Sequence, residues 1–285
     1  MTHEQIDAAL VRRLIEEQFP DWRSLVVRPV EIDGWDNRTF HLGDDLTVRL
    51  PSGPGYASQV DKEIRILPTV AAGVSLPVPE IVGIGAPSAD YPFSWTVRRW
   101  IDGTPARDVA GLDRDRFALD IARFLHELWG IEPEGGPPAG EHSAGRGGPL
   151  RQWDEEVHAT LGVLGDRVDA GRARELWDDA LHATDDHEQR WFHGDVAVGN
   201  LLTRHGRLSA VIDFGCAGVG DPACDLVIAW TLLDAAGRDA FRRAIGVDDA
   251  MWARASGWAL WKALITVDDP LRAAESSFTL RQLLG

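Results

Sequence analysis

The sequence predicts an α+β protein in two parts, with a small antiparallel sheet in the N-terminal third and a larger, mainly helical remainder. Short β-branched runs separated by turn residues dominate residues 1–101, whereas apolar residues recur at helical spacing from residue 112 onward. With 285 residues the chain can bury a sizeable core, as one domain or as two joined lobes. Its 44% hydrophobic and 26% charged residues are ordinary for a globular protein and exclude disordered or collagen-like chains.

The N-terminal part is expected to be a sheet with one helix before it and one inside it. Apolar residues at helical spacing between residues 6 and 14 predict the first helix, which Pro20 ends. A second helix is predicted at residues 56–72, where Pro68 should end or kink it. Strands are predicted at residues 25–30, 39–42, 46–50, 78–84 and 93–100.

The C-terminal part begins after a change in composition at residues 101–105, so we expect lobes at residues 1–101 and 102–285. A Gly- and Pro-rich segment at residues 133–149 is predicted to be a mobile loop at the rim of a pocket. Helices are predicted at residues 112–129, 150–164, 172–186, 221–233, 238–245 and 249–267, with one more near the C-terminus.

Net charge limits the kinds of partner that the protein can bind, and cysteine content indicates its compartment. The net charge of −16 argues against a nucleic-acid surface or an anionic membrane, and it is compatible with a cationic substrate or simply with solubility. Cys216 and Cys224 are interpreted as small buried residues in a reducing compartment. The N-terminus does not resemble a signal peptide, and no apolar run approaches the roughly 18–20 residues of a membrane helix, so we predict a cytoplasmic protein.

The residues that indicate chemistry are concentrated between residues 191 and 226. Asp195 follows His193 and Gly194, and Asn200 lies five residues beyond it. A β-branched run at residues 208–212 predicts a strand that ends at Asp213. One carboxylate and one amide would then share a loop, and a second carboxylate would enter from a strand end. This arrangement suits a divalent metal beside a hydroxyl nucleophile, whereas a lone Asp in a turn is usually a solvated cap.

These motifs resemble the aminoglycoside phosphotransferase family, which are small-molecule kinases with the protein-kinase fold. The resemblance rests on HGDVAVGN at residues 193–200, on IDFG at 212–215 and on GDPACDL at 220–226. It implies a protein-kinase-like fold of two lobes, an N-terminal lobe that binds ATP or GTP and a C-terminal lobe with the catalytic loop and acceptor pocket.

The resemblance also implies a role for each residue of these motifs. Asp195 would be the catalytic residue that orients the acceptor hydroxyl or accepts its proton, and Asn200 and Asp213 would hold Mg²⁺. His193 would brace the loop, while Asp221 and Asp225 would be structural, capping the helix that starts after Pro222.

Two features separate the chain from protein kinases. Ala197 stands where serine/threonine kinases usually carry Lys, and no activation segment follows Gly215, because Gly220-Asp221-Pro222 comes too soon. Both favour a small acceptor over a peptide.

On the nucleotide side, Arg49 replaces the strand lysine that contacts the phosphates, and the chain has only two lysines, Lys62 and Lys262. Glu63 is its natural ion-pair partner, although a solvated helix charge beside Lys62 is a serious alternative. A G-x-G-x-x-G loop is absent. The remaining candidates for nucleotide binding are the loop residues Asn37, Arg38 and Thr39, which an ordinary hairpin also explains, and the hinge residues Arg99, Trp100 and Ile101.

The acceptor side leaves several possibilities open. Acidic residues there would suit an aminoglycoside, although solvated helix ends explain most of them: Asp234, Asp239, Asp248, Asp249, Asp268, Asp269 and Glu275. Tryptophans could line an apolar pocket for a macrolide instead: Trp230, Trp252, Trp258 and Trp261. Macrolide kinases of this family often carry His where Asn200 stands, which favours an aminoglycoside. A metabolic kinase for choline or an amino-sugar, and a nucleotide-binding pseudokinase, are the alternatives.

Overall fold

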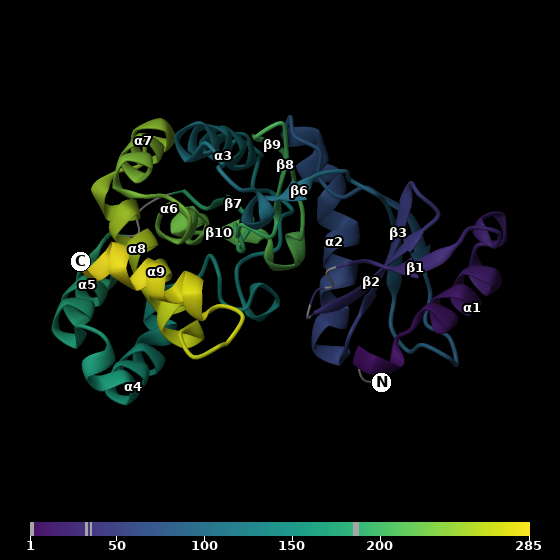
Figure 1. Ribbon diagram of the computed structural model, residues 1–285, viewed down its shortest axis with the longest axis horizontal. Helices are drawn as coiled ribbons and strands as arrows, with labels where there is room; N and C mark the ends of the chain where they lie inside the picture. The colour runs from purple at the N-terminus through teal and green to yellow at the C-terminus, as the bar shows by residue number, and fades with distance from the viewer. Residues whose placement is uncertain (1–2, 32–33, 35, 185–187) are drawn as a thin grey trace. The chain divides into compact units, whose positions relative to one another are not determined.

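The computed structural model describes residues 3–31, 34, 36–184 and 188–285, and the chain forms two compact units (Figure 1). The first unit comprises Met1–Ala72 and Pro77–Asp102, and the second comprises Gly73–Leu76 and Gly103–Gly285. An antiparallel sheet forms the centre of the first unit and the second is mainly helical, which confirms the predicted α+β class.

The first unit is a five-stranded antiparallel sheet in the order β1-β2-β3-β5-β4, with two long helices. Helix α1 begins at Asp7, whose side chain caps it by accepting a hydrogen bond from the Leu10 amide at 2.8 Å. In chain order the elements are α1 (Ala8–Gln18), β1 (Val27–Pro29), β2 (Asn37–Leu42), β3 (Leu46–Pro51), α2 (Pro54–Gly73), β4 (Ile81–Gly85) and β5 (Trp95–Arg99).

Alternation along the central strands gives this sheet two different faces. Val48 of β3 and Val97 of β5 are paired across the strands, and both belong to an apolar core shared with Leu14 of α1. The residues next to Val48 along β3 and next to Val97 along β5 point to the other face, because successive side chains of a strand alternate. On that face Arg98 reaches Glu63 of α2 at 2.8 Å. One face of the sheet is therefore apolar, and the other carries buried charged side chains.

Helix α2 runs through Pro68 to Gly73, so the proline does not end the helix, which was one of the two outcomes predicted for it. Proline removes one amide donor from a helix, but Leu67 and Val70 on either side are buried, and this packing stabilises the helix across the defect. Strand β2 begins earlier than expected, and β1, β4 and β5 are shorter. In the predicted nucleotide loop before β2, residues 33 and 35 lie outside the described residues.

The second unit consists of helices around two small sheets. Its helices are α3 (Arg114–Trp129), α4 (Asp154–Leu164), α5 (Ala170–His182), α6 (Ile228–Thr231), α7 (Ala235–Ile245), α8 (Asp249–Thr266) and α9 (Ala273–Leu284). Its strands are β6 (Thr104–Pro105), β7 (Arg190–Phe192), β8 (Leu201–Arg204), β9 (Arg207–Val211) and β10 (Gly218–Gly220), which form the sheets β6-β8-β9 and β10-β7. Helix α8 packs against α4, α5 and α9, and 11 of its 18 residues are buried.

Short 3₁₀ helices complete the two units. They are η1 (His3–Gln5), η2 (Pro20–Trp22), η3 (Ala106–Asp108), η4 (Glu141–Ser143), η5 (Leu150–Trp153), η6 (Gly165–Arg167), η7 (Phe214–Cys216) and η8 (Pro222–Val227). The helix predicted at residues 221–233 is in fact η8 followed by the single turn α6, and the one predicted at 150–164 begins as η5. The sequence also missed β6, β7, β8 and β10, because strands of two to four residues are too short to show a period.

The Gly- and Pro-rich segment at residues 133–149 is hydrogen-bonded to β10, and some of its residues line pockets, as predicted for the rim of a pocket. Val219 of β10 donates its amide to the Pro137 carbonyl and accepts from the Ala139 amide, both at 2.8 Å. The Asp221 amide donates to the Gly147 carbonyl at 2.8 Å. These backbone bonds hold the segment in place without any periodic side-chain pattern that the sequence could reveal.

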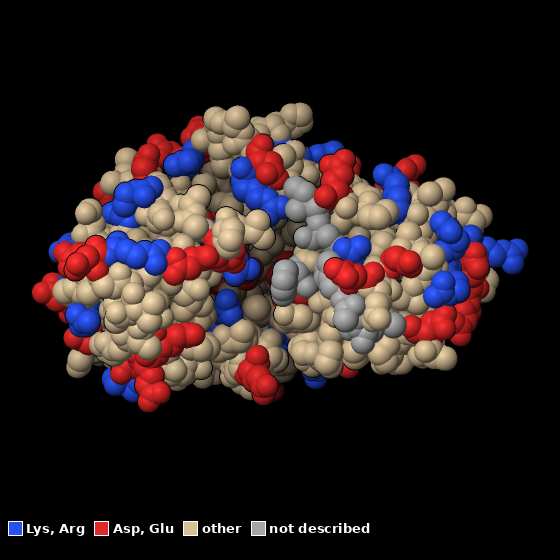
Figure 2. Space-filling model, turned by 60° about the horizontal axis from the view of Figure 1, so that its bottom comes forward, with Lys and Arg blue, Asp and Glu red and all other residues tan. Residues whose placement is uncertain are grey.

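Acidic and basic side chains are interspersed over the face of the molecule shown in Figure 2. Within the described ranges, each helix is too short or too polar to cross a bilayer.

Substituting Glu63 with Gln should destabilise the first unit. Glu63 is 1% exposed, and its loss of charge would leave the buried Arg98 guanidinium without its counter-ion. We expect the free energy of unfolding, measured in urea, to fall by about 3 kcal/mol. Glu80→Gln is the control, because its ion pair with Arg99 is exposed and should contribute less than about 1 kcal/mol. Equal effects of the two changes would contradict this account.

Candidate active site

The loop between β7 and β8 brings together the carboxylate and the amide selected from the sequence. Asn200 donates from Nδ2 to the carbonyl oxygen of Asp195 at 3.0 Å and to its Oδ2 at 2.9 Å. The Asn200 amide closes the turn by donating to the Ala197 carbonyl at 2.8 Å. The five-residue spacing therefore folds back on itself, and the Asp195 carboxylate is held in one orientation.

His193 holds this loop from inside the protein. Its ring is fully buried, Nδ1 accepts from the Asp195 amide at 3.2 Å, and Nε2 lies 3.0 Å from the Ile212 carbonyl oxygen. A ring nitrogen that accepts from an amide carries no proton, so we infer the neutral tautomer with its proton on Nε2. His193 thus links the loop to the end of β9, which is the bracing role expected for it.

Asp225 is fully buried and fixes the backbone of the same loop. Its Oδ2 accepts from the His193 amide at 2.8 Å and its Oδ1 from the Gly194 amide at 2.7 Å. The predicted role of Asp225 as a helix cap is therefore wrong, because its carboxylate points back at the loop. Asp221 is the residue that caps η8, accepting from the Ala223 amide at 3.1 Å.

Asp213 enters the site from the end of β9. The Ile212 amide donates to the Asn200 carbonyl at 2.9 Å, so Asp213 lies one residue beyond a fixed contact with the loop. Its φ of 67° lies in the left-handed region, which Asp tolerates better than most residues. Unusual backbone conformations of this kind concentrate at functional sites.

Asn200 and Asp213 offer donors that suit Mg²⁺. Because the Asn200 side-chain nitrogen donates to Asp195, its oxygen is the atom left to act as a ligand. Amide and carboxylate oxygens are hard ligands, and Mg²⁺ commonly takes one or two of them together with substrate phosphates. Among the described residues no cluster of three or more His, Cys, Asp or Glu could hold a metal alone. A metal here would depend on the phosphates of a nucleotide.

Two cations that sequence reasoning did not select lie near Asp195. Lys262 of α8 places Nζ 3.6 Å from Asp195 Oδ1, and Arg146 lies over the Trp261 ring, 5.3 Å from its centroid, in the same pocket. Burial opposes ionisation of Asp195, but Lys262 and Arg146, together with the other favourable contacts that include the hydrogen bond from Asn200, lower its pKa. Asp195 is therefore ionised at neutral pH. The scarcity of lysine was the one signal that could have drawn attention to Lys262.

The pocket at Asp195 is also lined by Cys224, Trp258 and Trp261. Trp230 instead packs against Trp252 with tilted rings, their centroids 4.7 Å apart, and only two of the four selected tryptophans line this pocket. Cys224 is buried as expected, whereas Cys216 is only half-buried, and both are thiols.

Most acidic residues proposed for a cationic acceptor serve the helices of the second unit. Those with such a contact are Asp234 and Asp248, which cap α7 and α8, Asp249 and Asp268, which pair with Arg242 and Arg167, and Asp269, which accepts from the Leu271 amide. The structural interpretation of these carboxylates is therefore the better one.

In the first unit, Arg49 and Glu63 form the expected ion pair at 3.6 Å. Glu63 binds more closely to the buried Arg98, which sequence reasoning did not select. Asn37 also faces Arg49: with its side-chain carbonyl turned toward the guanidinium, it accepts from Nε at 3.2 Å and Nη2 at 2.9 Å. Thr39 lies opposite Arg49 in the strand register. Glu63, Asn37 and Thr39 thus lie around the Arg49 side chain on the charged face.

Arg38 does not join this group. Side chains alternate along β2, so Arg38 shares the other face with Phe40 and lies 5.5 Å from its ring centroid. Its Nε donates to the Ile6 carbonyl at 3.3 Å.

At the predicted hinge, two of the three amides are already used. The Arg99 amide donates to the Glu80 carbonyl at 3.0 Å, and the Trp100 amide donates to the Asp45 carbonyl at 2.8 Å. Of the hinge amides, Ile101 is the one without a backbone acceptor in the described part of the chain.

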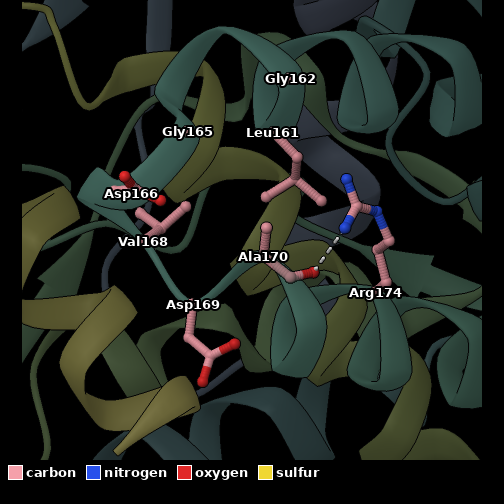
Figure 3. Close-up of a pocket in the computed structure, with 8 residues that line it drawn as sticks. All are labelled: Leu161, Gly162, Gly165, Asp166, Val168, Asp169, Ala170 and Arg174. Carbon is pink, nitrogen blue, oxygen red and sulfur yellow. Dashed lines mark hydrogen bonds between the residues drawn. The ribbon is translucent and has the colours of Figure 1, made fainter.

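A separate hollow lies between the end of α4 and the start of α5 (Figure 3). Asp169 caps α5 by accepting from the Arg172 amide at 3.0 Å, and Arg174 donates to the Ala170 carbonyl at 3.4 Å. Because these polar groups serve the helix end, we assign no catalytic role to this hollow.

The fold is that of known small-molecule kinases. A mutant of aminoglycoside 2'-phosphotransferase-IIIa, solved with GDP, superposes with a TM-score of 0.73 at 22% identity, covering 97% of this chain and 95% of that chain. The apoenzyme of a macrolide 2'-phosphotransferase from Brachybacterium faecium gives a TM-score of 0.65 at 21% identity, covering 97% of each chain. At these identities the similarity establishes the shared fold.

Sequence comparison then identifies the family. Residues 26–258 match the model of the phosphotransferase enzyme family. Hygromycin-B 4-O-kinase from Escherichia coli is 31% identical over 236 residues, which cover 78% of this chain and 66% of that protein, just under two thirds of its length. The chain belongs to the phosphotransferase enzyme family.

Stability should depend on pH through Asp225, whose pKa burial raises from its ordinary 3.8 to about 6. Between pH 3.8 and about pH 6, Asp225 keeps its proton in the folded chain but has released it in the unfolded chain. This proton stabilises the folded state at low pH, and the stabilisation is lost as pH rises through about 6. We expect the free energy of unfolding of wild type, relative to Asp225→Asn, to fall by about 2 kcal/mol between about pH 4.5 and about pH 7.5. A difference that is constant with pH would contradict the assignment.

Proposed function

We propose that this chain transfers the γ-phosphoryl group of a nucleoside triphosphate to a hydroxyl group of a small molecule, and that this acceptor is an aminoglycoside-type antibiotic. The observation that supports this function best is the hydrogen bond from Asn200 to the Asp195 carboxylate in a loop fixed by Asp225. Such a loop presents an ionised, oriented carboxylate, and phosphoryl transfer needs positioning and charge more than covalent chemistry.

In the proposed reaction the acceptor hydroxyl attacks the γ-phosphorus. The new oxygen–phosphorus bond forms while the bond from that phosphorus to the bridging β–γ oxygen breaks, and the hydroxyl proton passes to Asp195. The lowered pKa of Asp195 keeps its carboxylate ionised at neutral pH, so the carboxylate has no proton of its own when the hydroxyl proton is transferred. Asn200 holds the carboxylate in position, and His193 with Asp225 keeps the backbone from moving away from the acceptor.

The residues of the charged face in the first unit are proposed to contact the nucleotide. Arg49 offers a planar fork suited to phosphate oxygens, and Glu63 and Asn37 hold that fork in place. At the hinge, we propose that Ile101 contacts the purine through its backbone, because its amide is not engaged there. ATP and GTP are both candidates, and one structural neighbour was solved with GDP.

We propose Asn200 and Asp213 as the residues that would hold Mg²⁺. When bound, the metal would neutralise charge on the phosphate oxygens. The alternatives for the acceptor are a macrolide and a metabolic amino alcohol or amino-sugar. The 31% identity to hygromycin-B 4-O-kinase supports the aminoglycoside.

Turnover of ATP and of GTP against a panel of acceptors tests this function. Hygromycin B, kanamycin, a macrolide and choline should be compared, with product phosphate located by mass spectrometry. We expect an aminoglycoside to be phosphorylated. Stimulation by choline alone would contradict the antibiotic assignment, and Mg²⁺-dependent nucleotide binding without transfer to any acceptor would indicate a pseudokinase.

The same assay should distinguish Asp195→Ala from the matched surface change Asp268→Ala. Loss of an oriented general base lowers kcat by about 10²–10⁴-fold while nucleotide affinity is kept. Asp268 lies in an exposed ion pair with Arg167, so its loss should leave turnover near that of wild type. Wild-type turnover by Asp195→Ala would refute the catalytic assignment.

Asp213→Ala should lose the dependence of nucleotide binding on Mg²⁺. Calorimetric titration of ATP, with Mg²⁺ and with a chelator, should give different affinities for wild type and the same weak affinity for the variant. An unchanged response to the metal would exclude Asp213 as its ligand.

A further inference from the structure

The proposed catalytic loop has no cation of its own that could assist Arg49 and Mg²⁺ in balancing the charge of the phosphoryl group. The six residues from Asp195 to Asn200 read Asp-Val-Ala-Val-Gly-Asn and carry no cationic side chain. During phosphoryl transfer negative charge spreads over the oxygens of the moving group, and cations close to it supply much of the catalysis. A cation is therefore expected from another element.

Lys262 is the cation nearest to the catalytic carboxylate. It projects from α8, a largely buried helix of the second unit, and its Nζ lies 3.6 Å from Asp195 Oδ1. Among the described residues, Asp195 is the one whose carboxylate lies within 4 Å of the Lys262 ammonium nitrogen. Arg146 lines the same pocket, but its guanidinium is held over Trp261.

We propose that Lys262 is a catalytic residue of this chain, which donates to a non-bridging oxygen of the phosphoryl group as that group passes to the acceptor. The inference rests on the phosphotransferase function proposed above. Bond formation and cleavage are those of that reaction, and the proton still passes to Asp195. Lys262 remains an ammonium ion throughout.

The geometry favours this role over a purely structural one. A separation of 3.6 Å exceeds a direct hydrogen bond, so the ammonium group keeps donors available for a phosphoryl oxygen. The Lys262 and Asp195 side chains are partly buried, at 20% and 37% exposed, so a bound phosphoryl group could still reach both of them. A lysine fixed on a buried helix beside the catalytic carboxylate is therefore better explained by chemistry.

The positive charges of Lys262 and Arg146 also argue against binding of a cationic group of the acceptor in this pocket. Two of the residues that line the pocket are cations, and Asp195 is its one carboxylate among the described residues. An amine of the acceptor would be repelled here, so the acceptor hydroxyl must approach with its amino groups directed elsewhere.

Lys262→Met tests the proposal, because Met has a similar length and no charge. We expect kcat to fall by about 10²-fold, with KM for nucleotide and acceptor within about threefold of wild type, because the interaction is made in the transition state. Lys262→Arg should recover at least about tenfold of the lost rate, since it restores a cation. Arg281→Gln, which removes an exposed cation from α9, is the control and should keep wild-type kinetics.

Thermal unfolding of each variant separates catalysis from folding, and Lys262→Gln replaces Lys262→Met if the latter does not fold. A kcat close to that of wild type in the folded neutral variant overturns the proposal. So does a raised KM for the acceptor with unchanged kcat, because it would make Lys262 an acceptor-binding residue. Absence of transfer by wild type overturns the proposed function itself, which distinguishes the two failures.

Discussion

The buried Asp225 carboxylate is the contact on which the rest of the site depends. It accepts the amides of His193 and Gly194, and those two residues fix where Asp195 begins. Gly194 has a φ of +81°, and a Cβ there would lie 2.7 Å from the Cys216 carbonyl oxygen, so only glycine allows this close approach. A carboxylate kept from water is costly, and the two amides offset part of that cost, while burial still raises the pKa of Asp225 to about 6.

Buried charge organises the first unit in a similar way. Glu63 lies between Arg98 and Arg49, at 2.8 and 3.6 Å, so one carboxylate faces two guanidinium groups. Arg98 takes the closer contact with Glu63. Under the proposed function, Glu63 would hold both guanidinium groups in place while Arg49 contacts anionic phosphates.

Cations lie in the Asp195 pocket, whereas most of the carboxylates that were considered for the acceptor have structural contacts elsewhere. Lys262 and Arg146 place positive charge where the phosphoryl group would move, whereas most carboxylates selected for the acceptor cap helices or form surface pairs. The net charge was compatible with a cationic acceptor or simply with solubility, because it is a sum over the whole chain and says nothing about the charge at one site. Local charge at the catalytic carboxylate has the opposite sign, and it constrains how an amine-bearing acceptor can approach.

The sequence by itself determined the α+β class, the long helices and the association of Asp195 with Asn200, because period and spacing are local properties of the chain. It also indicated Arg49 and Glu63 as a pair. Only the tertiary structure decided that Asp225 serves the catalytic loop 30 residues away, that Arg98 shares Glu63, that Arg38 faces the other side of the sheet, and that Lys262 reaches Asp195. Those contacts join segments far apart in the chain, and a strand register or a helix orientation sets them. No local pattern encodes either.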